Sequence, residues 1–254
     1  MISYKGLFYE VINIKDRLGE ININTNGTLM KIIAYRKSDD IDVEFLDDSH
    51  YIEEHQIYSN FKNGLIKSPY DKTLYGVGYI GVGEYNTGTK DEHTKEYVTW
   101  RNMLRRCYDK KHKNKFPAYY GICTVCDEWH NFQTFAKWYH ENIYYVGTER
   151  MHVDKDIICS DNKIYSPETC FIVPQRINML FKEKRNKYNL PSGIRQKANG
   201  KYEAVYNGKH LGTFNTIEFA IKAHDDENKK AIIKIANEYR YKIPEKLYEA
   251  LIMR

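Results

Sequence analysis

The sequence predicts an α+β protein built from three small parts, and three observations support this. The N-terminal third contains short runs of alternating apolar and polar residues, which are typical of half-buried strands. Aromatic residues then recur at helical spacing in the middle of the chain. Two Asn-Gly pairs, at 199–200 and 207–208, follow near the C-terminus, and Asn-Gly is the strongest short-range signal of a β-hairpin. A length of 254 residues suits two or three small domains.

Residues 1–75 are expected to form a small β-barrel-like domain. Strands are predicted over 29–35 and 41–45, and the second alternates strictly between apolar and acidic side chains. A polar turn over 37–40 separates them, and this spacing fits a small antiparallel barrel. The part holds nine basic against twelve acidic residues. It should therefore repel DNA phosphates rather than attract them.

Residues 76–186 are expected to form a second domain. Its glycine-rich opening, 76–83, lacks the Lys-Ser/Thr pair of a phosphate-binding loop and is interpreted as a flexible joint. Two apolar stripes at helical spacing are then expected in the core. They consist of Trp100, Met103, Leu104 and Cys107, and of Trp129, Phe132, Phe135, Ala136 and Tyr139.

Residues 187–254 are predicted to form a three-stranded sheet followed by a helix. The strands are expected over 192–197, 202–206 and 210–214, joined by the two Asn-Gly turns. Residues 215–218 have the pattern of a helix cap, and the apolar face of the helix would hold Phe219, Ala220, Ala223 and Ile221.

The charge of this C-terminal part points to nucleic acid. From Lys182 onward the chain holds sixteen Lys or Arg against nine Asp or Glu, in contrast to its acidic beginning. Strand alternation places Arg195 and Lys197 on a common face of the sheet. A sheet backed by one helix leaves its other face free, and such a face fits the major groove of DNA.

Within this part, residues 193–195, 200–204 and 211–225 resemble the APETALA2/ethylene-response-factor type of DNA-binding domain over about 40 residues. Tyr202 stands where that family usually has tryptophan, and the sheet carries fewer arginines, which implies weaker or less selective binding. The resemblance implies that the residues facing double-stranded DNA are Arg195, Lys197, Lys201, Tyr202 and Lys209.

The segment 152–178 has the outline of a ββα-metal unit, and residues 97–181 are similar to phage HNH-like homing endonucleases. The resemblance implies hydrolysis of DNA phosphodiester bonds, with Asp154 binding Mg²⁺. His152 lies on the same strand face as Asp154 and would activate water. The motif's histidine position holds Lys155 and its asparagine position holds Thr169, and a protonated lysine is a poor base. The implied catalytic set is His152, Asp154, Lys155, Asp156 and Asn178.

These departures leave a second function open: a catalytically inactive DNA- or protein-binding factor, such as a regulator or a phage inhibitor of a host defence system. A protein partner would then bind the acidic N-terminal part, whose charged run also suits an ordinary solvated strand edge. No residue excludes RNA binding. The acidic run consists of Asp39, Asp40, Asp42, Glu44, Asp47 and Asp48.

The cysteines predict reduced thiols or a metal site, because they are five in number and no export signal precedes them. Cys123 and Cys126 have the CxxC spacing of a zinc knuckle, and Cys107 and Cys170 are candidates to complete a structural Zn²⁺ site. Cys107 equally suits a buried free thiol. No apolar run approaches the roughly 20 residues that span a bilayer. We therefore expect a cytoplasmic protein with no membrane partner, in the host cytoplasm if a phage encodes it.

Overall fold

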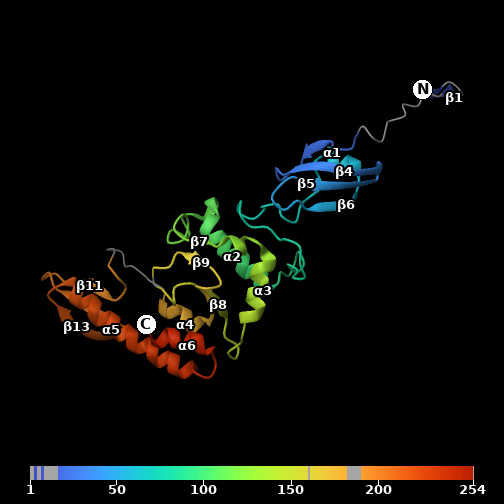
Figure 1. The fold of residues 1–254 in the computed structure, drawn as a ribbon. Coiled ribbons are helices and arrows are strands. Elements are labelled where there is room, and N and C mark those ends of the chain that lie inside the picture. Colours follow the sequence, from blue (N-terminus) through green and yellow to red (C-terminus); the bar gives the residue numbers. More distant parts are fainter. Residues whose placement is uncertain (1–2, 5–6, 9–16, 160, 182–189, 254) are drawn as a thin grey trace. The chain divides into compact units, whose positions relative to one another are not determined.

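The computed structural model describes residues 3–4, 7–8, 17–159, 161–181 and 190–253 (Figure 1). Helices and mainly antiparallel sheets occur together, which confirms the α+β class. The chain divides into two compact units, one formed by residues 1–120 and 127–137 and the other by 121–126 and 138–254.

The first unit begins with strands. β1 (Ser3–Tyr4) and β2 (Leu7–Phe8) pair with each other. A four-stranded antiparallel sheet of order β3-β4-β5-β6 follows, and then helix α1 (Tyr58–Lys62). The sheet consists of β3 (Ile21–Ile23), β4 (Leu29–Lys37), β5 (Asp40–Phe45) and β6 (Ile52–Gln56).

Strand β5 confirms the predicted alternation. Ile41, Val43 and Phe45 are fully buried, whereas the acidic residues between them are partly exposed. The predicted barrel is wrong, because β3 and β6 are edges that do not pair with each other in the described part of the chain. Four strands, two of them short, are too few to close a barrel. Phe61 of α1 packs into the core of the open sheet instead.

A buried carboxylate holds the turn between β3 and β4. Asp71 is only 4% exposed. Its oxygens accept hydrogen bonds from Asn24 (2.9 Å), Asn26 (2.8 Å), Thr28 Oγ1 (2.6 Å) and the Ser68 amide (2.9 Å). Burial alone would raise the pKa of Asp71, but these donors together hold it below its usual value. Asp71 thus ties the turn to a loop more than forty residues later.

Both aromatic stripes are buried, as predicted. The Trp100 indole donates a hydrogen bond to the Trp129 carbonyl (2.7 Å), and its ring centroid lies 5.4 Å from that of Phe132. The elements that carry these residues are α2 (Lys95–Tyr108), η2 (Lys110–His112), η3 (Asp127–His130) and α3 (Phe132–Asn142).

The glycine-rich stretch is docked against these helices and is not a free joint. The Tyr79 amide donates to the His130 carbonyl (3.0 Å), and the Phe132 amide donates to the Tyr79 carbonyl (2.9 Å). A Cβ atom on Gly78 would lie 2.5 Å from Leu104 Cδ1. The glycines therefore allow close packing of backbone against α2 and α3, which corrects the interpretation as a flexible linker.

The second unit combines short strand pairs with helices. β7 pairs with β9 in parallel, and β8 pairs with β10 in antiparallel fashion. The elements between residues 121 and 181 that belong to this description are β7 (Thr124–Val125), β8 (Met151–Asp154), β9 (Ile164–Tyr165), β10 (Phe171–Pro174), α4 (Gln175–Asn178) and η4 (Met179–Phe181).

The C-terminal part of this unit has the predicted three-stranded sheet and helix. Asn207 and Gly208 both have positive φ, as a two-residue type I′ hairpin turn requires. Phe219 is 61% exposed, so its predicted place on the buried helix face is wrong. The elements are β11 (Ile194–Gln196), β12 (Tyr202–Tyr206), β13 (Lys209–Phe214), α5 (Ile217–Tyr239) and α6 (Glu245–Ile252).

Helix α5 runs beside the C-terminal sheet and beside α6 (Figure 1). It belongs to two hydrophobic cores. Ala220 near its start packs with Ile194 and Ala204 of the sheet. Ile232 and Ala236 near its end pack with residues of β10, α4 and α6. The two compact units do not follow the three expected domains, 1–75, 76–186 and 187–254. Residues 76–120 and 127–137 group with the N-terminal part, and the rest of the middle part groups with the C-terminal part.

Replacing Asp71 by alanine should lower the free energy of unfolding of the first unit by about 3 kcal/mol, because several buried donors lose their acceptor. The folded pKa lies below the unfolded value of about 3.9, so this contribution is present above that pH and is lost as the pH falls through the folded pKa. Urea unfolding at neutral and acidic pH measures both effects. Asp39→Ala, at a side chain 60% exposed, is the matched control. Equal stability of the two variants would contradict the assigned role.

Candidate nucleic-acid interface

The free face of the C-terminal sheet lies opposite α5. Ile194 pairs with Ala204 across β11 and β12, and both are buried toward the helix. The next pair, Arg195 and Glu203, therefore faces away from it, and Thr213 lies opposite Glu203 on β13.

The charges on this face partly cancel. Glu203 lies 3.2 Å from Lys197 Nζ and 3.4 Å from His210 Nε2. Arg195 and Lys201 are exposed, and neither forms an ion pair with a described residue. The face thus presents two unpaired cations and one acid that neutralises a third cation.

Two of the predicted DNA-facing residues lie on the helix side instead. Tyr202 packs against the core that contains Ala220, and its hydroxyl accepts a hydrogen bond from Gln196 (3.3 Å). Lys209 donates to Glu227 of α5 (2.9 Å). The structure brings Arg195, Lys197 and Lys201 to one side of the sheet and leaves Tyr202 and Lys209 on the other.

The segment predicted as a ββα-metal unit forms two paired strands followed by a short helix, which we call the ββα arrangement. β8 and β10 form an antiparallel pair in which Asp154 lies opposite Phe171 and His152 opposite Val173, and α4 follows β10 directly. Asp154 and His152 share one side of β8, as predicted. Asn178, at the end of α4, is partly exposed.

Asp154 is poorly placed to hold an ion. Its side chain belongs to a residue only 7% exposed, and burial raises its pKa above the usual value. One carboxylate oxygen already accepts a hydrogen bond from the Asp156 amide (2.8 Å). Among the described residues, no three His, Cys, Asp or Glu side chains bring their ligand atoms together at Asp154. A carboxylate this enclosed leaves little room for the water molecules that usually complete the coordination of Mg²⁺.

Lys155 is an internal cation and not an exposed base. It is 4% exposed, and its ammonium donates to the Asp156 carboxylate and to the Asn162 carbonyl (2.9 Å). The Asn162 amide group donates back to the Lys155 carbonyl (2.9 Å) and to the Ile164 carbonyl (2.8 Å). These bonds form a clamp, which we call the Lys155 clamp, that closes the loop between β8 and β9.

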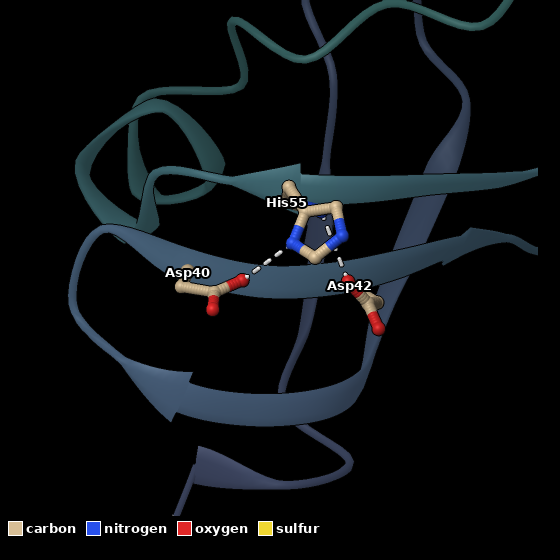
Figure 2. Close-up of side chains that lie close together, drawn as sticks. All are labelled: Asp40, Asp42 and His55. Atoms are coloured by element: carbon tan, nitrogen blue, oxygen red, sulfur yellow. Dashed lines mark hydrogen bonds and ion pairs between the residues drawn. The ribbon is translucent and has the colours of Figure 1, made fainter.

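One cluster of potential metal ligands does occur among the described residues, on the N-terminal sheet. Figure 2 shows His55 beside Asp40 and Asp42: its Nδ1 atom lies 2.9 Å from Asp40, and its amide donates to Asp42 (3.0 Å). Arg36 also bonds both carboxylates, at 2.7 Å from Asp40 and 2.8 Å from Asp42. Hydrogen bonds from Arg36 hold the pKa of Asp40 and Asp42 below the usual range.

This cluster is an ion-pair network, since the Arg36 guanidinium already supplies the positive charge. Arg36 also neutralises part of the negative charge of the acidic run, which the sequence suggested as a protein-binding face. The acids were visible in the sequence, but no motif linked them to His55, which lies thirteen residues beyond Asp42.

The cysteines do not gather into a metal site in the described part of the chain. None of the five described cysteines forms a disulfide. Burial raises the pKa of Cys170 to about 12, so this thiol stays protonated near neutral pH. Cys107 lies in the first unit, whereas Cys123, Cys126 and Cys170 lie in the second.

Comparison of the chain with protein families, with curated protein sequences and with solved structures finds no match. Within the described ranges, no helix is long and apolar enough to cross a membrane.

Replacing Lys155 by methionine should lower the free energy of unfolding of the second unit by about 2 kcal/mol or more, because Asp156 and Asn162 lose a buried partner. Hydrogen exchange should also speed up at the amides of the β8–β9 loop. Lys163→Met, at an exposed position of the same loop, is the control. Unchanged stability and exchange in Lys155→Met would show that the clamp does not hold the loop.

Proposed function

We propose that this protein binds duplex DNA through the free face of its C-terminal sheet. The observation that carries the proposal is the position of Arg195 and Lys201, which are exposed and unpaired among the described residues on a sheet whose other face is covered by α5. An antiparallel sheet of this size fits the major groove, and arginine is the side chain that most often reads guanine there.

The charge balance supports loose rather than selective recognition. Lys197 is engaged by Glu203, so few cations are available for phosphates. Glu203 itself lies beside Arg195 and would approach the phosphates or the bases. Binding through this face is therefore expected to be modest, with a shallow salt dependence of about 0.9 in the slope for each phosphate contact. The resemblance to the APETALA2-type domain supports the same reading, with the departures at Tyr202 and Lys209 described above.

Metal-dependent cleavage of DNA is the second candidate. The order β8–β10–α4 favours it, with His152 and Asp154 on one side of β8. The burial of Asp154 and the use of Asp156 by the Lys155 clamp argue against it. We therefore favour a DNA-binding factor, such as a regulator, in which the ββα arrangement is a scaffold.

Arg195→Ala should weaken binding to a short fluorescent duplex by about tenfold, because one of the two unpaired cations of the face is removed. Glu203→Gln should strengthen binding several-fold, since it releases Lys197 and removes a charge that repels phosphates. Fluorescence anisotropy over a salt series measures both. Lys209→Gln, on the helix side, is the control and should change little. An effect of Lys209→Gln as large as that of Arg195→Ala would place the interface elsewhere.

Supercoiled plasmid incubated with the protein and Mg²⁺ should be retarded on a gel but not cut, because the carboxylates near β8 are buried or paired. Parallel reactions with EDTA and with Asp154→Ala complete the experiment. Nicking or linearisation that needs both Mg²⁺ and Asp154 would instead establish the endonuclease.

A further inference from the structure

A second basic surface lies in the first unit, at the C-terminal end of α2. Residues 101–115 carry seven Lys or Arg but a single acid, Asp109. We define the basic corner as six of these seven cations. They are Arg101, Arg105, Lys110, Lys111, Lys113 and Lys115.

Aromatic rings position the arginines without neutralising them. Arg101 and Arg105 are one helical turn apart on α2 and share a face. The guanidinium carbon of Arg101 lies 5.5 Å from the centroid of the Tyr97 ring, and that of Arg105 lies 5.9 Å from the centroid of Phe116. Such contacts hold a guanidinium in place and leave its charge intact.

The one acid of the segment is used internally. The Asp109 side chain is 11% exposed and lies 2.7 Å from His112 Nδ1. It also accepts a hydrogen bond from the Lys111 amide (2.9 Å) and so caps η2. The lysines of the basic corner are exposed, and none of its six cations forms an ion pair with a described residue. This differs from the C-terminal sheet, where Glu203 engages Lys197.

Helix stability accounts for only part of this charge. Cations in the last turn of a helix interact favourably with its dipole, which explains Arg105. The four lysines lie beyond the end of α2, where that effect has faded. A row of exposed cations that form no ion pair with a described acid is complementary to a polyanion with regularly spaced charges.

We propose that the basic corner binds the phosphate backbone of duplex DNA, as a second contact in addition to the C-terminal sheet. The inference rests on the proposed DNA binding of the chain. It adds that the first unit contributes affinity independent of base sequence, despite the acidic N-terminal sheet in the same unit.

The test uses the full chain with Lys110, Lys111, Lys113 and Lys115 all changed to glutamine. The control removes the same four charges from exposed lysines elsewhere in the first unit. These are Lys62, Lys67, Lys72 and Lys90. Circular dichroism melts establish that both variants fold, and anisotropy with a random-sequence duplex over a salt series measures affinity.

The basic-corner variant should bind about tenfold or more weakly at low salt, and its salt slope should fall by about 2–3, since each lost phosphate contact removes about 0.9. The control should stay within about twofold of the parent chain. If both variants lose the same amount of affinity, net charge alone explains the loss and the proposal is wrong. The proposal is also wrong if neither variant loses affinity. If the basic-corner variant loses binding to double-stranded RNA but keeps its binding to duplex DNA, the proposal is wrong and the basic corner binds RNA.

Failure of the two proposals can be told apart. If the parent chain does not bind duplex DNA, the proposals for the C-terminal sheet and for the basic corner are both wrong. If it binds and only Arg195→Ala weakens it, the basic corner alone is rejected. A second measurement uses the parent chain without substitutions. The rate at which each lysine is acylated is compared in the presence and absence of duplex DNA. Protection is expected at Lys110–Lys115 and not at Lys67 or Lys72, and the reverse pattern would overturn the proposal.

Discussion

The second unit depends on helix α5, because each half of this helix packs into a different hydrophobic core. Ala220 belongs to the core under the C-terminal sheet, and Ile232 and Ala236 belong to the core shared with α4 and α6. At 23 residues the helix is about 35 Å long, enough to serve both. A continuous helix offers no hinge, so the sheet and the β8–β10 pair are held in a fixed relation.

The chemistry of that arrangement depends on where charge is buried. Lys155 occupies a position at which a catalytic base would have to be accessible, yet it is used to close a loop. Asp154 has lost most of its contact with solvent, and its pKa is raised accordingly. Buried charges that are paired stabilise a conformation, whereas catalysis needs groups that substrate and solvent reach. A fold can therefore have the strand arrangement of an enzyme without its catalytic function.

Local features could be predicted from the sequence because neighbouring residues determine them. The alternation in β5 and the Asn207-Gly208 turn are such cases. Features that depend on distant residues could not be predicted. The glycine-rich stretch is ordered by packing of Gly78 on α2, and Lys209 turns toward the helix because Glu227 lies there. Strand alternation alone gives no means of choosing between the two sides of a sheet for a residue at a hairpin turn.

Under the two proposals, two cationic surfaces on separate units would together provide the affinity for DNA. The sheet presents few unpaired cations, and the basic corner has no base-reading geometry of its own. Contacts that are individually weak gain strength when one chain links them, because the second binding event becomes intramolecular. Phosphate contacts in the first unit would raise affinity for any sequence, and Arg195 would add preference. Under these proposals the acidic N-terminal sheet would not contact DNA, and Arg36 pairs with two of its carboxylates, Asp40 and Asp42.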